Sequence, residues 1–179
     1  MRIAYADPPY IGQAKRHYGP EAKEVNHQIL IGYLEEFDGW ALSCSSPSLR
    51  EILPLCPDDV RIGAWVKPFC AFKRGVRPAY AWEPVIYKGG RNPPSYKHPP
   101  PVKGGQQTTP KDFVSANITL KKGLVGVKPP EFCQWIFALL NACPDDEFID
   151  VFPGSGAVMN EWRVFSCPQS DAVEDDLFF

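Results

Sequence analysis

Four residues near the start of the chain combine a carboxylate, two prolines and an aromatic ring: Asp7, Pro8, Pro9 and Tyr10. Proline lacks a backbone N–H and has a fixed φ, so this pair ends a strand and holds the following residues in a rigid, extended turn. The Pro8 carbonyl can then face outward beside the Asp7 carboxylate. Two such acceptors next to an aromatic ring suit an amino group on a flat heterocycle. A strand-ending turn with an N-cap aspartate is the alternative interpretation.

A second candidate site lies near the far end of the chain, where Phe152, Pro153, Gly154, Ser155 and Gly156 separate an apolar strand from a helix. Glycines have no Cβ atom, so they let a ligand approach the backbone closely at a helix N-terminus. Any tight strand-to-helix turn also prefers glycine. This segment alone therefore predicts a turn, and a ligand site only in combination with another motif.

The basic residues are concentrated in the middle of the chain. The chain as a whole carries a formal net charge of -2, but residues 61–128 contain thirteen Lys or Arg and only two acidic residues. A block this one-sided is typical of a face that binds a polyanion such as nucleic acid. A solvated loop that only maintains solubility would have the same composition. The candidate nucleic-acid contacts are Lys73, Arg74, Arg77, Lys88, Arg91, Lys97 and Lys103.

Length and composition indicate one globular domain. The chain has 179 residues, of which 44% are hydrophobic and 22% charged, as in ordinary single domains. No apolar run is long enough to cross a bilayer and no signal peptide is apparent, so we expect a cytoplasmic protein. The six cysteines are scattered and form no Cys-x-x-Cys pair, so we expect neither zinc nor disulfides.

Hydrophobic periodicity predicts strands that alternate with helices. We expect strands at residues 2–6, 40–44, 60–66, 81–87 and 147–152. We expect helices at residues 21–37, 49–53, 130–140 and 157–165. This alternation predicts an α/β fold with a mostly parallel central sheet flanked by helices. Residues 88–123 are rich in Pro, Gly and basic side chains, and we interpret them as a long loop that binds nucleic acid.

In this order along the chain, the Asp7–Tyr10 motif and residues 150–156 resemble the S-adenosylmethionine-dependent amino methyltransferases of nucleic acids, which act on adenine N6 or cytosine N4. The first segment resembles the catalytic Asp-Pro-Pro-aromatic motif of that family, and the second its Phe-x-Gly-x-Gly motif. Catalytic motif first and cofactor motif last is the circularly permuted arrangement that the family calls beta. Three intermediate segments add to the resemblance: Trp65-Val66-Lys67-Pro68, Trp82-Glu83-Pro84-Val85-Ile86 and Gly126-Val127-Lys128-Pro129.

The resemblance implies a role for each matching residue. Asp7 and the Pro8 carbonyl would accept hydrogen bonds from the exocyclic amino group of the target base, and Tyr10 would stack on that base. Asp150 would lie near the methionine ammonium group of S-adenosylmethionine, and Lys128 near its carboxylate. The remaining residues that would line the cofactor are Asp7, Phe152, Gly154, Ser155 and Gly156.

The implied activity is methylation of adenine N6 in DNA. Cytosine N4, adenine in RNA and a smaller nucleobase substrate are alternatives, as is a non-catalytic nucleic-acid-binding subunit that has the methyltransferase fold. Family members usually continue after the glycine motif with a strand whose terminal acid holds the adenosine ribose. Only the helix at 157–165 and an acidic tail follow here. We therefore expect a shortened C-terminal end, and a homodimer or partner subunit is a way to complete the site.

Overall fold

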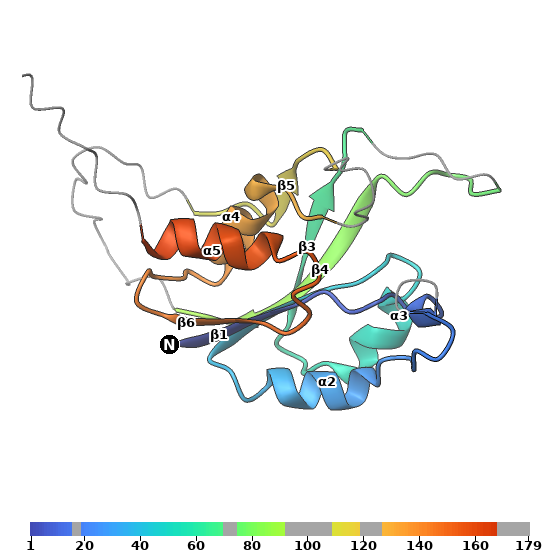
Figure 1. Cartoon of the computed structure of the whole chain (residues 1–179), viewed down its shortest axis with the longest axis horizontal. Helices are drawn as coiled ribbons and strands as arrows, with labels where there is room; N and C mark the ends of the chain where they lie inside the picture. The colour runs from blue at the N-terminus through green and yellow to red at the C-terminus, as the bar shows by residue number, and fades with distance from the viewer. Residues whose placement is uncertain (16–18, 70–74, 92–108, 119–126, 168–179) are drawn as a thin grey trace, which may run out of the picture.

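The computed structural model describes residues 1–15, 19–69, 75–91, 109–118 and 127–167 (Figure 1). Its centre is a six-stranded sheet in the order β5-β3-β4-β2-β1-β6. The strands are β1 (Arg2–Ala6), β2 (Gly39–Ser43), β3 (Arg61–Val66), β4 (Trp82–Gly89), β5 (Phe113–Ser115) and β6 (Glu147–Asp150).

All strands of the sheet except β4 run in the same direction. β1 is parallel to both β2 and β6, and β3 is parallel to β5, whereas β4 lies antiparallel between β2 and β3. This confirms the expectation of a mostly parallel sheet. Five strands therefore finish at one end of the sheet, which we call the carboxyl end, and β4 begins there. The opposite end, where β4 finishes, is called the amino end.

Helices cover both faces of the sheet and make a three-layer α/β/α arrangement (Figure 1). Helices α4 (Pro130–Leu139) and α5 (Ala157–Ser166) lie on one face. Helices α2 (His27–Leu34) and α3 (Leu49–Ile52) lie on the other, and a 3-10 turn (Leu53–Leu55) continues α3. No helix within these described ranges is long and apolar enough to cross a membrane.

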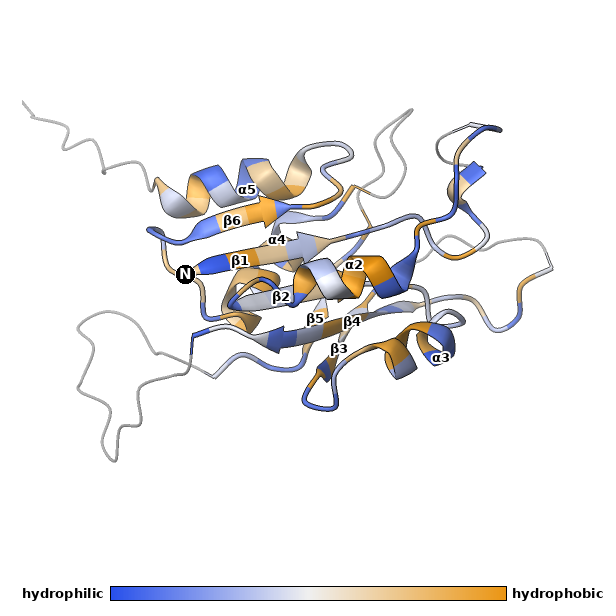
Figure 2. Ribbon diagram, turned by 90° about the horizontal axis from the view of Figure 1, so that it is seen from below, coloured by the Kyte–Doolittle hydropathy of each residue, from blue (hydrophilic) through white to orange (hydrophobic). Residues whose placement is uncertain are grey.

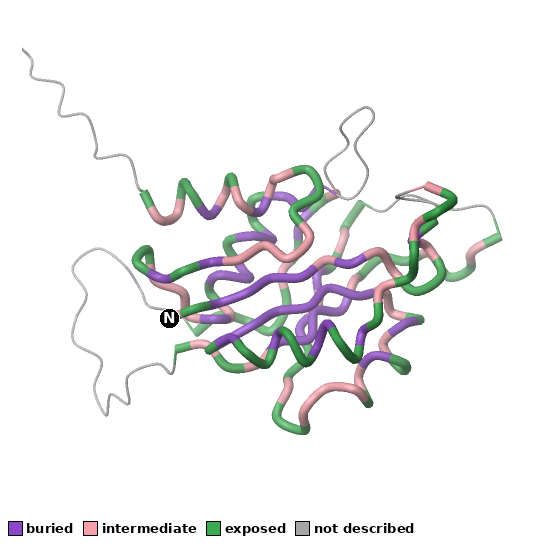
Figure 3. Tube along the Cα trace, turned by 60° about the horizontal axis from the view of Figure 1, so that its bottom comes forward, coloured by how far each residue is buried: buried purple, intermediate pink, exposed green. Residues whose placement is uncertain are grey.

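Each face has its own hydrophobic core because side chains alternate across a strand. In β1, Ile3 and Tyr5 pack toward α4 and α5, whereas Ala4 and Ala6 pack toward α2. Helix α2 lies over this face of the sheet in Figure 2, and its buried apolar residues belong to the same core as Ala4 and Ala6. The central strands are accordingly the most continuously buried part of the chain (Figure 3).

Helix α2 is shorter than the predicted helix at residues 21–37. It begins at His27 because the side chain of Asn26 caps it, accepting a hydrogen bond of 3.1 Å from the Ile29 N–H; a side-chain cap of this kind fixes a helix start. Gly39 opens β2. A Cβ atom at Gly39 would lie 2.4 Å from the Gly90 backbone nitrogen, so this position needs glycine for the close approach of two chain segments.

The predicted loop at residues 88–123 contains regular structure at both of its ends. β4 continues through Lys88 and Gly89, and Phe113–Ser115 forms β5 beside β3. A three-residue strand carries too little periodicity to be recognised from sequence. The segment thus leaves the sheet at the amino end and returns through β5 toward the carboxyl end. Residues 92–108 and 119–123 of the predicted loop lie outside the described residues.

Candidate active site

The two sequence motifs meet at the carboxyl end of the sheet. Asp7 follows the last residue of β1, and the glycine turn follows β6, which is the direct neighbour of β1. Tyr5 and Asp150 are register partners in these two strands. Ligands of open α/β sheets bind outside the carboxyl ends of the strands. Asp7 and Asp150, which are 143 positions apart in the chain, therefore lie at the same potential site.

Asp7 is the carboxylate that this site exposes. Its side chain is 24% exposed, and its Oδ2 atom lies 3.1 Å from Nζ of Lys128. Burial raises the pKa of Asp7; Lys128 opposes this effect, but the pKa remains above its ordinary value. Pro8 is buried and Pro9 half-buried, so the turn is packed against the protein. The Asp7 carboxylate is thus held in place while part of it faces solvent.

Tyr10 is half-buried and its hydroxyl lies beside Glu83. Burial raises the pKa of Tyr10 well above its ordinary value, so the hydroxyl is neutral at physiological pH. Tyr5 is fully buried in β1, the strand that leads into Asp7, and its hydroxyl shares a hydrogen bond of 2.8 Å with the Ser43 hydroxyl. Two tyrosines therefore flank the Asp7 carboxylate without adding charge.

Lys128 is a buried cation beside Asp7. Its side chain is only 6% exposed, and Nζ lies 3.4 Å from Oε2 of Glu83 in addition to its contact with Asp7. Burial lowers the pKa of Lys128, but the two carboxylates more than offset this, and the pKa lies above its ordinary value. Lys128 thus bridges two acidic side chains, and its contact with a cofactor carboxylate stays a prediction.

Glu83 and Lys67 complete this charged cluster. Lys67 forms an ion pair with Oε1 of Glu83, and Lys128 contacts the other carboxylate oxygen. Burial raises the pKa of Glu83, but the two lysines outweigh it and hold the pKa below its ordinary value. Sequence reasoning assigned no role to Lys67 or Glu83. The available signal was that each charged residue closely follows a tryptophan, Lys67 just after the end of β3 and Glu83 at the start of β4.

The glycine turn after β6 is open to solvent. Gly154 and Ser155 are exposed, and both Gly154 and Gly156 have positive φ angles, of 46° and 74°. Gly156 is the N-cap of α5, and no atom lies within 4 Å of the position that its Cβ would occupy. Phe152 is half-buried at the start of the turn. Positive φ favours glycine, so the turn needs this residue type for its conformation and leaves free space above the backbone.

Asp150 ends β6 and faces the same region. Its side chain accepts a hydrogen bond of 3.3 Å from the Phe152 N–H. Burial raises its pKa to about 6, although the Phe152 N–H counteracts part of the increase and Asp7 adds to it. A carboxylate with this pKa is ionised at neutral pH and gains from a cationic partner. The geometry is compatible with the predicted contact to an ammonium group.

The predicted nucleic-acid contacts separate into three groups. Arg77 is exposed in the connection between β3 and β4, at the carboxyl end. Lys88 and Arg91 lie at the amino end because β4 runs antiparallel to its neighbours. There Lys88 pairs with Glu35 at 2.6 Å, and Arg91 pairs with Asp146 at 2.7 Å. These two side chains therefore belong to the far end of the fold. The others lie outside the described residues: Lys73, Arg74, Lys97 and Lys103.

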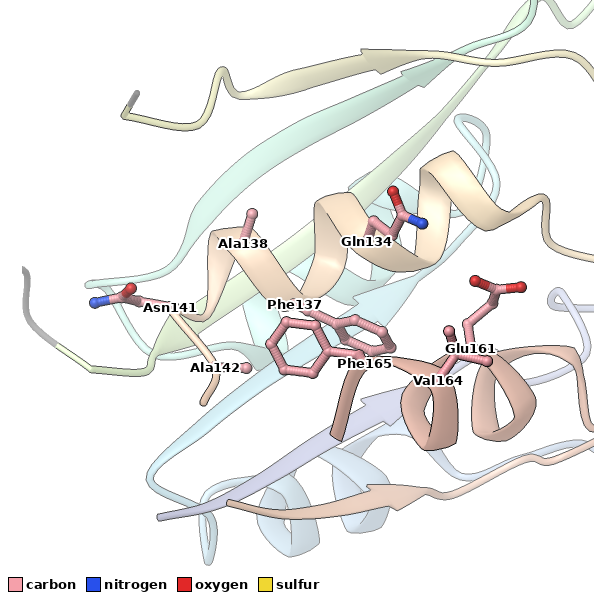
Figure 4. A pocket seen from close by; sticks show the side chains of 8 residues that line it. All are labelled: Gln134, Phe137, Ala138, Asn141, Ala142, Glu161, Val164 and Phe165. Carbon is pink, nitrogen blue, oxygen red and sulfur yellow. The ribbon is translucent and has the colours of Figure 1, made fainter. Parts of the chain in front are cut away.

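A cavity of about 340 Å³ lies away from this site, between α4 and α5 (Figure 4). Phe137, Phe165 and Val164 provide its apolar surface and Glu161 lies at one side. None of the residues that line it belongs to either sequence motif. In the described part of the chain, no three His, Cys, Asp or Glu side chains are grouped so that they could hold a metal ion.

The chain is similar to solved structures in fold. No protein-family model and no curated protein sequence matches it. The crystal structure of the M1.HpyAVI-SAM complex superposes with a TM-score of 0.58 at 15% sequence identity, covering 92% of this chain and 78% of that one. The crystal structure of M1.HpyAVI gives a TM-score of 0.55 at 14% identity, covering 92% and 76%. The chain therefore has the α/β fold of these proteins, with a six-stranded sheet between two layers of helices.

Proposed function

We propose that this protein transfers a methyl group from S-adenosylmethionine to the N6 amino group of adenine in DNA. One observation carries the proposal: the Asp7–Tyr10 motif and the Gly154–Gly156 turn follow adjacent parallel strands and open onto the same end of the sheet. A hydrogen-bond acceptor for an amino group and an open turn for a cofactor would thus lie side by side. The fold similarity to M1.HpyAVI, whose structure includes SAM, supports the same conclusion.

On the base side, Asp7 and Pro8 would orient the target. The partly exposed Asp7 carboxylate and the Pro8 carbonyl would accept the two amino hydrogens, directing the nitrogen lone pair toward the methyl donor. The Tyr10 ring would stack on the base. A base in a duplex must first be rotated out of the stack, at a cost of a few kcal/mol that stacking and hydrogen bonds repay. Positioning the two reactants then supplies much of the acceleration.

On the cofactor side, the residues after β6 fit S-adenosylmethionine. When bound, this cofactor supplies a methyl group already activated by a sulfonium. The open backbone of Gly154 and Gly156 leaves room for a ligand at the start of α5. Asp150 would pair with the ammonium group, and Phe152 and Ser155 would contact the rest of the methionine portion. Lys128 is engaged with Asp7 and Glu83, so we assign it to the base side.

The charge state of Asp7 sets the pH range of the proposed reaction. Only the ionised carboxylate has no proton of its own and acts purely as a hydrogen-bond acceptor, and it would also be the acceptor for the proton that the methylated amine must lose. Because burial raises the pKa of Asp7, acidification protonates Asp7 at a higher pH than it protonates an ordinary aspartate. We expect the rate to decrease on acidification with the titration of this group.

The test is methyl transfer from labelled S-adenosylmethionine to four substrates: adenine-containing duplex DNA, DNA whose only amino base is cytosine, RNA, and free nucleotides. Digestion and mass spectrometry of the nucleosides identify the methylated base. N6-methyladenine in DNA is expected from the wild type and not from Asp7→Ala. Product only from cytosine, RNA or nucleotides would replace the proposed substrate. DNA binding without any product would identify a non-catalytic binding protein instead.

A further inference from the structure

The partly exposed carboxylate of the site belongs to a cluster of four charged side chains, and the other three are largely buried. The cluster contains the acids Asp7 and Glu83 and the bases Lys67 and Lys128, with Lys128 shared between the two acids at 3.1 and 3.4 Å. The side chains of Lys67, Glu83 and Lys128 are 11%, 16% and 6% exposed. Buried charges are costly unless they are paired. A cluster of this size at the end of a sheet therefore requires a reason beyond solubility.

Three separate elements bring these side chains together. Glu83 is the second residue of β4 and is the register partner of Trp65 in β3. Lys67 follows β3 directly, and Lys128 lies just before α4. The Trp65 ring lies close to both lysines, with its centroid 4.4 Å from Nζ of Lys67 and 5.2 Å from Nζ of Lys128. The Trp65 indole N–H donates a 2.8 Å hydrogen bond to the Ala116 carbonyl, so this ring is fixed in turn.

The two acids are not equivalent. Each carboxylate oxygen of Glu83 is engaged by a lysine and the Tyr10 hydroxyl lies beside it, so Glu83 is held by partners within the protein. Asp7 has Lys128 on Oδ2 only; among the described residues no hydrogen-bond partner is present for Oδ1, and the side chain is partly exposed. Asp7 is therefore free to touch a substrate, whereas Glu83 is engaged by its neighbours in the cluster.

We propose that Glu83 is a positioning residue: by sharing Lys128 with Asp7, it keeps that lysine from neutralising Asp7 and leaves the Asp7 carboxylate available as an acceptor for the amino group. This inference rests on the proposed function of the site. A lysine that contacts a single carboxylate offsets more of that carboxylate's charge than a lysine that is shared between two carboxylates. Lys67 keeps Glu83 ionised, because it occupies the oxygen that Lys128 does not contact.

The proposal makes opposite predictions for the two partners of Asp7. With Glu83→Gln, Lys128 pairs with Asp7 alone, so the pKa of Asp7 falls. With Lys128→Met, Asp7 loses its cation and keeps an acid nearby, so its pKa rises further. The directions agree with the contributions of the neighbours, since Glu83 raises the pKa of Asp7 and Lys128 and Lys67 lower it. The charged or titratable groups that face Asp7 are Lys128, Glu83, Lys67, Tyr5, Tyr10, Cys44 and Asp150.

The experiment has a readout that does not depend on turnover. The ionisation of Asp7 is followed by the carboxyl carbon resonance in NMR, assigned by its loss in Asp7→Asn. We expect the midpoint to move down in Glu83→Gln, up in Lys128→Met, and not at all in Glu36→Gln, a control on an exposed glutamate after α2. The proposal would be overturned if the Asp7 midpoint moved in the same direction in Glu83→Gln and Lys128→Met, or if it did not move in Glu83→Gln.

Kinetics then test the consequence for catalysis. For Glu83→Gln we expect kcat to fall about tenfold or more with little change in KM for S-adenosylmethionine, as is typical when a group supporting a reacting residue is lost. The acidic limb of the kcat profile should move in the same direction as the NMR midpoint, and Glu83→Asp should restore part of the rate. An unchanged kcat in Glu83→Gln contradicts the positioning role.

A second variant keeps the proposal testable if Glu83→Gln does not fold. In Lys67→Met, Glu83 loses its own cation and draws more strongly on Lys128, so the Asp7 midpoint should move up; a downward move would overturn the proposal. If the wild type shows no methyl transfer to any substrate, the proposed function fails, but the NMR titration still decides whether Glu83 controls Asp7. The two failures are therefore distinguishable.

Discussion

The two ends of the sheet each hold a carboxylate among cations, yet they treat it differently. At the amino end, Asp146 has a side chain that is 2% exposed and lies 2.7 Å from both the Met1 amino group and Arg91. It also accepts a 2.8 Å hydrogen bond from the Cys143 N–H. Burial raises the pKa of Asp146, but these donors outweigh it and bring the pKa below its ordinary value. This carboxylate is fully engaged in holding the chain together.

At the carboxyl end, Asp7 has one cationic contact, and that cation is shared with Glu83. The pKa of Asp7 lies above its ordinary value, whereas the pKa of Asp146 lies below its ordinary value. The difference separates a structural carboxylate from one that is available for chemistry: the first is satisfied by the fold, and the second is left with an unsatisfied oxygen facing solvent. Variants at both ends of the sheet test that distinction.

Replacing Asp7 by Asn should abolish most of the proposed methyl transfer. The amide oxygen is a weaker acceptor and cannot take up a proton, so we expect initial rates to fall by about 100- to 1000-fold, the loss typical for one preorganised electrostatic contact in a transition state. Binding of S-adenosylmethionine, measured by calorimetry, should change little. A rate within a factor of about two of the wild type would remove Asp7 from the reaction.

The same substitution at the other end should affect stability instead. In Asp146→Asn the charge-assisted hydrogen bonds to Arg91 and the Met1 amino group are weakened, so we expect the free energy of unfolding to decrease by about 1.5–3 kcal/mol. Urea denaturation at neutral pH measures the change. The rate per folded molecule should stay at the wild-type value. Lost activity in a folded Asp146→Asn protein would contradict the division between the two ends.

Replacing Gly156 by Ala tests the backbone of the glycine turn. The positive φ of Gly156 disfavours any other residue, so we expect a loss of about 1 kcal/mol in unfolding free energy and weaker binding of S-adenosylmethionine. Gly32→Ala is the matched control, because Gly32 lies inside α2 with open space around it. That change should stabilise the protein by about 0.5–1 kcal/mol. If Gly156→Ala and Gly32→Ala changed the unfolding free energy equally, the positive φ of Gly156 would not be the cause of the loss.

The pH dependence of stability should have opposite signs at the two ends. A carboxyl whose folded pKa is lowered stabilises the protein above its unfolded pKa, and this contribution disappears as the pH falls through the folded pKa. The stability advantage of the wild type over Asp146→Asn should therefore shrink on acidification. Asp7 has a raised pKa, so relative to Asp7→Asn the wild type should gain stability on acidification. Urea denaturation at neutral and acidic pH measures both differences; equal signs would contradict the comparison.

The smallest effect is expected for two arginines on the surface. Arg77 is exposed at the carboxyl end, whereas Arg91 is paired with Asp146 at the amino end. If Arg77 contacts a DNA phosphate, Arg77→Ala should reduce the slope of log affinity against log salt by about 0.9. Arg91→Ala should leave that slope unchanged and lower the stability. A change of slope in Arg91→Ala alone would place the nucleic acid at the opposite end of the protein.

Much of the fold follows from local sequence. Alternating apolar segments indicated five of the six strands, and the Asp7–Tyr10 motif and the glycine turn were each recognised where a strand ends. Strand β5 was not recognised because its three residues are too few for a pattern. The start of α2 was predicted six residues too early, because apolar spacing does not reveal that the Asn26 side chain caps the helix.

Local sequence specifies which residues have the right chemistry: an acid before two prolines, glycines between a strand and a helix, and a parallel arrangement of strands that brings them to one end of the sheet. The partners of these residues come from the tertiary arrangement. The antiparallel direction of β4 brings Glu83 to Asp7 and sends Lys88 and Arg91 to the far end. Strand direction and side-chain pairing depend on contacts between segments that are distant in the chain, and no local pattern encodes them.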